Sequence, residues 1–96
     1  SRPGSVRGVV KDKRTGEAIP QAQITISNGG YEVSKGMPDF DGRYNIGPVT
    51  SGTYEISCKV FGYNTVTMQK VGVPGGRPRV LDFKLASADV VLWSII

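Results

Sequence analysis

The segment AQITIS, residues 22–27, alternates apolar and polar side chains without a break, and this pattern decides the fold. Ala22, Ile24 and Ile26 share one face of an extended chain, and the polar residues between them share the other. A period of two is typical of a strand with one buried and one solvated face. The NGG turn at residues 28–30 favours a tight hairpin directly afterwards, because Asn and Gly tolerate positive φ.

The same alternation recurs along the rest of the chain, between turns rich in glycine, proline, asparagine and aspartate. It predicts about seven short antiparallel strands, and no apolar repeat of about 3.6 residues is long enough for a packed helix. In the sixth strand the apolar positions change face near Gln69, which indicates a bulge. In the last strand Leu81, Phe83 and Leu85 are expected to face inward. The strands are expected at residues 6–12, 22–27, 31–35, 43–49, 52–60, 65–73 and 79–86.

Seven strands at this spacing predict an all-β sandwich formed by one domain. The 96 residues can bury a modest core without a metal or a disulfide. Cys58, the only cysteine, shares a strand face with Tyr54 and Ile56, so a small core residue is expected rather than a reactive thiol.

Composition excludes several classes of function. The chain has no histidine, which removes the commonest general base and the Ser–His and Cys–His pairs, so no enzyme and no cofactor are expected. Its net charge is +4, but the 12 basic residues are spread along the sequence, so no nucleic-acid partner is expected. Asp39 and Asp41 resemble part of a calcium loop, yet the loop is too short, and a hairpin turn without metal is expected.

Three aromatic side chains are not clearly assigned to the core, namely Tyr31, Tyr63 and Trp93. Exposed rings on a sandwich can stack on sugars, so these residues are the candidate ligand-binding site, with an oligosaccharide as the candidate ligand. The alternative is structural: Tyr31 covers a hairpin, Tyr63 caps a corner, and Trp93 packs on the sandwich or on a following domain. Trp93 belongs to an apolar tail that is much shorter than the roughly 20 residues of a membrane-spanning helix, so no membrane span is expected.

Six motifs occur in an order that points to one family: GVVKD at 8–12, TGEAIP at 15–20, AQITI at 22–26, DFDGRYNI at 39–46, GTYEI at 52–56 and FGY at 61–63. Each motif is weak alone, but their order and spacing resemble the carboxypeptidase regulatory-like domain family. The resemblance covers about Ser5 to Leu85.

The resemblance implies a transthyretin (prealbumin)-like Greek-key sandwich that is generally not catalytic. Transthyretin-like hydrolases would require a catalytic histidine. Such domains occur as appendages on carboxypeptidases and, in Bacteroidetes-type bacteria, at the front of TonB-dependent outer-membrane nutrient receptors. The resemblance therefore implies an exported protein of the periplasm, outer membrane or cell surface.

The expected organisation is a linker at 1–4, the sandwich at 5–86, and an apolar strand or the start of the next domain at 87–96. Two functions follow as hypotheses. The first is a structural or docking module whose partners are neighbouring domains of the parent protein, and the alternative is a carbohydrate-binding module that uses the exposed aromatics.

Overall fold

Eight strands separated by turns make up the part of the chain that the structure, a computed structural model, describes, residues 2–88. The long strands alternate buried and exposed side chains, as the period of two predicts. Within this range no helix could cross a membrane. The strands are β1 (Gly4–Asp12), β2 (Gln23–Asn28), β3 (Tyr31–Gly36), β4 (Arg43–Val49), β5 (Gly52–Lys59), β6 (Val66–Val73), β7 (Pro78–Val80) and β8 (Phe83–Leu85).

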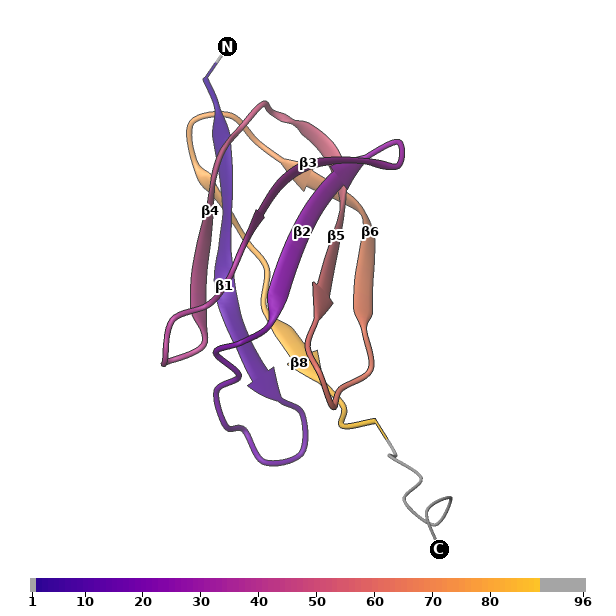
Figure 1. Cartoon of the computed structure of the whole chain (residues 1–96). Helices are drawn as coiled ribbons and strands as arrows, with labels where there is room; N and C mark the ends of the chain where they lie inside the picture. Colours follow the sequence, from indigo (N-terminus) through magenta and orange to yellow (C-terminus); the bar gives the residue numbers. More distant parts are fainter. Residues whose placement is uncertain (1, 89–96) are drawn as a thin grey trace, which may run out of the picture.

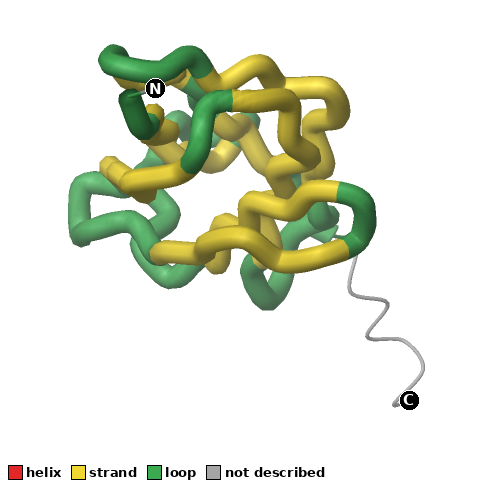
Figure 2. The backbone as a smooth tube through the Cα atoms, turned by 90° about the horizontal axis from the view of Figure 1, so that it is seen from above, coloured by secondary structure: helices red, strands yellow, loops and turns green. Residues whose placement is uncertain are grey.

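The strands form two sheets that face each other, as Figures 1 and 2 show from two directions. The first sheet has the order β4-β1-β7, with β8 pairing β1 farther along, and the second has the order β3-β2-β5-β6. The prediction of an all-β sandwich is therefore confirmed.

The interior between the sheets is apolar, and it contains no buried polar or charged residue among those described. Inward positions of both sheets contribute to it, including Cys58, whose predicted place in the core is confirmed. Phe83 is the largest fully buried side chain, and its ring lies 6.2 Å from that of Tyr44. The buried residues are Val6, Val10, Ile19, Ala22, Ile24, Ile26, Tyr44, Ile46, Val49, Tyr54, Ile56, Cys58, Val71, Val73, Phe83 and Leu85.

The last strand differs from its prediction. The expected continuous, antiparallel strand at 79–86 is two short strands, β7 and β8, and both run parallel to β1. The chain breaks at Leu81 and Asp82, where the Leu81 amide donates to the carbonyl of Arg7 at 2.7 Å. Asp82 Oδ1 accepts from the Val9 amide at 2.9 Å, so a side chain replaces the strand carbonyl there. The alternation of apolar and polar residues cannot show the direction of pairing, because it is the same in parallel and antiparallel strands.

The predicted bulge in the sixth strand is confirmed. Tyr54 pairs with Val71 but Ile56 pairs with Met68, so the register shifts between them. Lys70 lies at the shift with φ of 55°, in the left-handed region, which lets one additional residue fit opposite β5.

The sandwich has two distinct ends, between which all the long strands run (Figure 1). The entry end carries residues 2–3, the β2–β3 turn and the loop 74–77. The exit end carries the loops 13–22, 37–42 and 60–65, and the chain leaves the last strand there. The first and last described residues therefore lie at opposite ends of the molecule.

Candidate functional site

Tyr31 and Tyr63, two of the three candidate aromatic residues, lie at opposite ends of the sandwich. Tyr31 is 80% exposed and begins β3 at the entry end. Tyr63 is half-buried and follows β5 at the exit end, so the length of a strand separates the two rings. Trp93 and the rest of the predicted tail, residues 89–96, lie outside the described residues. A sugar site formed jointly by Tyr31 and Tyr63 is therefore not available.

Tyr63 instead links two loops of the exit end. Its hydroxyl donates to Asp12 Oδ2 at 2.7 Å. The other carboxylate oxygen, Asp12 Oδ1, accepts from the amides of Arg14 at 2.8 Å and Thr15 at 3.0 Å. The Tyr63 hydroxyl, followed by these amides, lowers the pKa of Asp12, and the same bond raises the pKa of Tyr63. The side chain thus fixes the corner where β1 ends, as the structural interpretation of Tyr63 predicts.

The chain leaves the sandwich through the same corner. The Asn64 amide donates to the carbonyl of Ala86, and the Ala88 amide donates to the carbonyl of Gly62, both at 2.9 Å. Tyr63 and Ser87 form the antiparallel bridge between these two bonds. We call residues 62–64 and 86–88, with Asp12, the exit corner. Phe61, which precedes the exit corner in the sequence, is 97% exposed.

The Asp39 side chain caps the turn that it begins. Asp39 Oδ1 accepts from the amides of Asp41 and Arg43, both at 2.9 Å. Gly42 has φ of 78°, which a turn of this kind requires. No group of three or more His, Cys, Asp or Glu side chains able to hold a metal occurs among residues 2–88.

The outward face of the first sheet gathers basic side chains, which the sequence pattern did not predict. Arg7 and Lys11 flank Val9 on β1, and Arg43 of β4 lies directly opposite Val9. Lys84 of β8 lies beside Lys11. All four basic residues are exposed, and we call them the basic face. Period two alone places Arg7 with Lys11, but only the pairing of β1 with β4 and β8 brings in the other two.

A shallow groove crosses the basic face. Its volume is about 290 Å³. Arg7 and Arg43 line it together with the amide of Asn45 and the apolar Val9 and Val80. Asp82 is the only carboxylate in its lining, and one of its oxygens already accepts from the Val9 amide. The groove therefore combines guanidinium groups, an amide and a small apolar floor.

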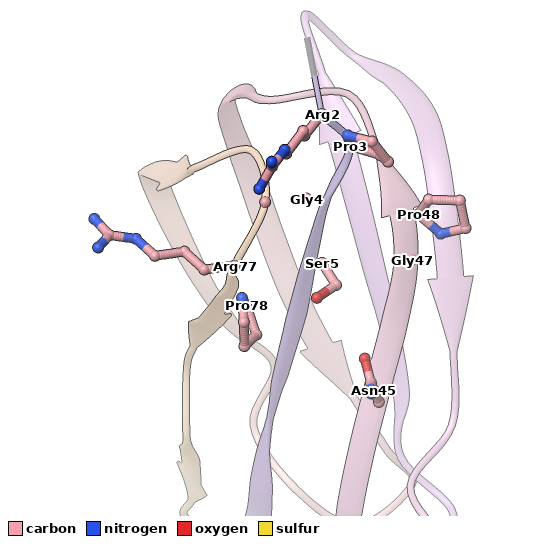
Figure 3. Close-up of a pocket in the computed structure, with 10 residues that line it drawn as sticks. Arg2, Pro3, Gly4, Ser5, Asn45, Gly47, Pro48, Arg77 and Pro78 are labelled. Atoms are coloured by element: carbon pink, nitrogen blue, oxygen red, sulfur yellow. The ribbon is translucent and has the colours of Figure 1, made fainter.

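A second depression of about 660 Å³ continues toward the entry end (Figure 3). Asn45 lines both depressions, so they are adjacent on the sheet. Arg2 reaches across the entry end, whereas Arg77 points away from the other lining side chains (Figure 3). Because the polar groups do not converge on a point, the depression is not built like a pocket for a small ligand.

Residues 5–86 match the family model described as the carboxypeptidase regulatory-like domain. No curated protein sequence matches the chain.

Several solved structures share the fold at low identity. A candidate carbohydrate binding protein from Bacteroides uniformis ATCC 8492 has a TM-score of 0.71 at 20% identity, over 88% of this chain and 42% of that one. A type II cohesin–X-dockerin complex from Acetivibrio cellulolyticus gives 0.69 at 20% identity, over 93% and 61%. Klebsiella pneumoniae 5-hydroxyisourate hydrolase gives 0.64 at 17% identity, over 88% and 91%.

At these identities the likeness establishes the fold alone, which is the transthyretin-like sandwich that the motifs predict. This chain spans less than two thirds of the length of the first two matched chains.

Proposed function

Because this chain belongs to the carboxypeptidase regulatory-like domain family, we propose that it is a non-catalytic accessory module that spaces and docks neighbouring domains of an exported envelope protein. The parent protein in this proposal is of the outer-membrane nutrient-receptor kind, in the periplasm or at the cell surface. The absence of histidine from the whole sequence supports a non-catalytic role, since the commonest general base is missing.

One observation carries the proposal: the described chain enters at one end of the sandwich and leaves at the other (Figure 1). The nine residues of β1 alone span about 30 Å at the usual rise per residue. The exit segment is held by the backbone bonds of the exit corner and not by side chains alone. These bonds fix the direction in which the chain leaves the sandwich at Ala88, which a spacer requires.

The proposal is tested by attaching a small fluorescent reporter domain after Ile96 and measuring the decay of its fluorescence anisotropy. We expect the reporter to tumble with the sandwich as one body. Tyr63→Phe removes the bond to Asp12 and should loosen the exit corner, so the decay should become faster and the Ala88 amide should exchange hydrogen sooner. Tyr31→Phe is the matched control, because it removes the same atom at the opposite end. A reporter that already tumbles freely on the unaltered chain would show that the module does not position its neighbour.

The second candidate function is carbohydrate binding through an exposed aromatic ring. It is supported by Tyr31, whose ring is 80% exposed at the β2–β3 hairpin and free to stack on a sugar. Thermal unfolding against a panel of neutral oligosaccharides tests it, since a ligand raises the midpoint only when it binds the folded state. A shift that disappears in Tyr31→Ala would favour this function, and no shift across the panel would leave the spacing role.

A further inference from the structure

We infer that the basic face, Arg7, Lys11, Arg43 and Lys84, is a binding surface for an acidic polysaccharide whose chain lies along β1. This inference goes beyond the spacing role and does not depend on it, since the exit corner takes no part in the surface. The ligand class is a linear glycan that carries carboxylate groups.

The charge of the face is the first argument. Its four basic side chains lie within about two residue positions of Val9, which corresponds to roughly 7 Å along a strand and about 5 Å between strands. The second sheet is different, because there the basic Lys35, Lys59 and Lys70 are mixed with the acidic Glu32 and Glu55. The positive charge is therefore concentrated on one side of the sandwich, where it attracts a negatively charged partner.

The pairing of Lys11 with Lys84 is the second argument. The two residues are direct neighbours in the β1–β8 register, and both side chains are exposed. Like charges side by side on neighbouring strands are destabilising. A bound carboxylate between them would remove this repulsion, so the arrangement favours an anionic ligand over an empty surface.

The groove is the third argument, and it selects the class of partner. It lies over β1 between its two neighbouring strands, which are roughly 10 Å apart. This width suits one sugar chain, whose hydroxyl groups Asn45 could bond and whose apolar ring faces Val9 and Val80 could contact. A DNA duplex is broader, since its major groove alone is about 12 Å wide.

Single-stranded nucleic acid and membranes fit the face less well. Bases stack on exposed aromatic rings, and the exposed rings among residues 2–88 are Tyr31, Phe40 and Phe61, which belong to β3 and to loops at the exit end. A membrane surface would meet the sheet as a plane and would leave the groove unfilled. The acidic polysaccharide is the partner that uses the charges, the amide and the apolar floor together.

The experiment measures binding of polygalacturonate oligosaccharides of about ten units to the whole chain by calorimetry, at about 50 mM and about 300 mM NaCl. We expect binding at low salt that weakens by roughly tenfold or more at the higher salt, and no binding of a neutral glucan of equal length. Arg43→Gln with Lys84→Gln should weaken binding about tenfold, because two charge contacts are lost. The control pair is Lys35→Gln with Lys59→Gln, which lowers the net charge by the same amount but on the other sheet. It should change the dissociation constant by less than about twofold.

Three results would overturn the inference. The first is no binding of polygalacturonate at low salt, and the second is an equal loss in both double variants, which would show an effect of net charge alone. The third is tighter binding to duplex DNA, to single-stranded DNA or to vesicles containing anionic lipid than to polygalacturonate, which would assign the face to another partner. The binding experiment and the anisotropy of a reporter attached after Ile96 are independent measurements. Failure of this inference therefore leaves the spacing role untouched.

Discussion

The hydroxyl of Tyr44 donates a hydrogen bond to the main-chain carbonyl of Leu81, at the point where the final strand breaks into β7 and β8. Tyr44 pairs with Gly8 in the β1–β4 register, and the Leu81 oxygen occupies the space that a side chain of residue 8 would need. Burial, with a smaller contribution from Asp82, raises the pKa of the Tyr44 phenol, so the hydroxyl stays protonated as a donor. One glycine and one tyrosine thus hold the break in place.

Gly8→Ala should destabilise the fold. A Cβ at this position would overlap the main-chain oxygen of Leu81, so either β1 or the break between β7 and β8 must move. We expect the free energy of unfolding to fall by about 1–3 kcal/mol, the usual cost of overpacking. Urea unfolding measures it. Gly72→Ala is the control, because a Cβ at residue 72 would meet nothing within 4 Å, and it should change stability little. Equal effects of both substitutions would show that close approach at Gly8 is not the cause.

The bond between Tyr63 and Asp12 should give the fold a dependence on acid pH. The pKa of Asp12 is lower in the folded chain than in the unfolded chain. The ionised carboxylate therefore adds to the free energy of unfolding above the unfolded pKa of about 3.9. This stabilisation is lost as the pH falls through the folded pKa. Tyr63→Phe removes the largest cause of the shift, so unfolding free energy should fall less steeply below about pH 4. Urea unfolding at a series of pH values measures this slope. Tyr31→Phe should keep the slope of the unaltered chain, and a Tyr63→Phe slope that also stays the same would contradict the assignment.

Cys58 should resist thiol reagents until the chain unfolds. It is fully buried, and burial raises the pKa of its thiol to about 11, so almost no thiolate is present at neutral pH. With an aromatic disulfide reagent we expect no labelling in native buffer and complete labelling in urea. Ser57→Cys places a second thiol on the outward side of β5 and should react at once. Rapid labelling of Cys58 in native buffer would be incompatible with this core.

Lys84→Glu should stabilise the fold. It turns the like-charged neighbours Lys11 and Lys84 into an ion pair across β1 and β8, which we expect to add about 0.2–1 kcal/mol at low salt. The gain should shrink as salt increases, because both side chains are exposed. Lys35→Glu faces Thr25 on the second sheet and should change stability by less than about 0.5 kcal/mol. A Lys84→Glu chain no more stable than the Lys35→Glu chain would argue against repulsion on the basic face.

The local residue pattern predicted much of the fold of this protein. The alternation of Ala22, Ile24 and Ile26 predicted which face of β2 is buried, because the side-chain period of a strand is fixed by its backbone. The change of face near Gln69 predicted the bulge for the same reason. Each of these two patterns is readable within a few residues of chain, and the order of the motifs along the sequence pointed to the family that matches residues 5–86.

Only the tertiary structure shows the features that depend on residues far apart in the sequence. Nothing near Leu81 signals that the chain turns parallel to β1, because pairing direction is set by a strand more than 70 residues earlier. The basic face depends on the same pairing, which places Lys84 beside Lys11. The sequence pattern also did not predict that Tyr31 and Tyr63 lie at opposite ends of the sandwich, because the residue type alone does not show where a ring lies in the fold. The sequence determined which residues are strands and core, and the pairing of distant strands decided which surface residues meet.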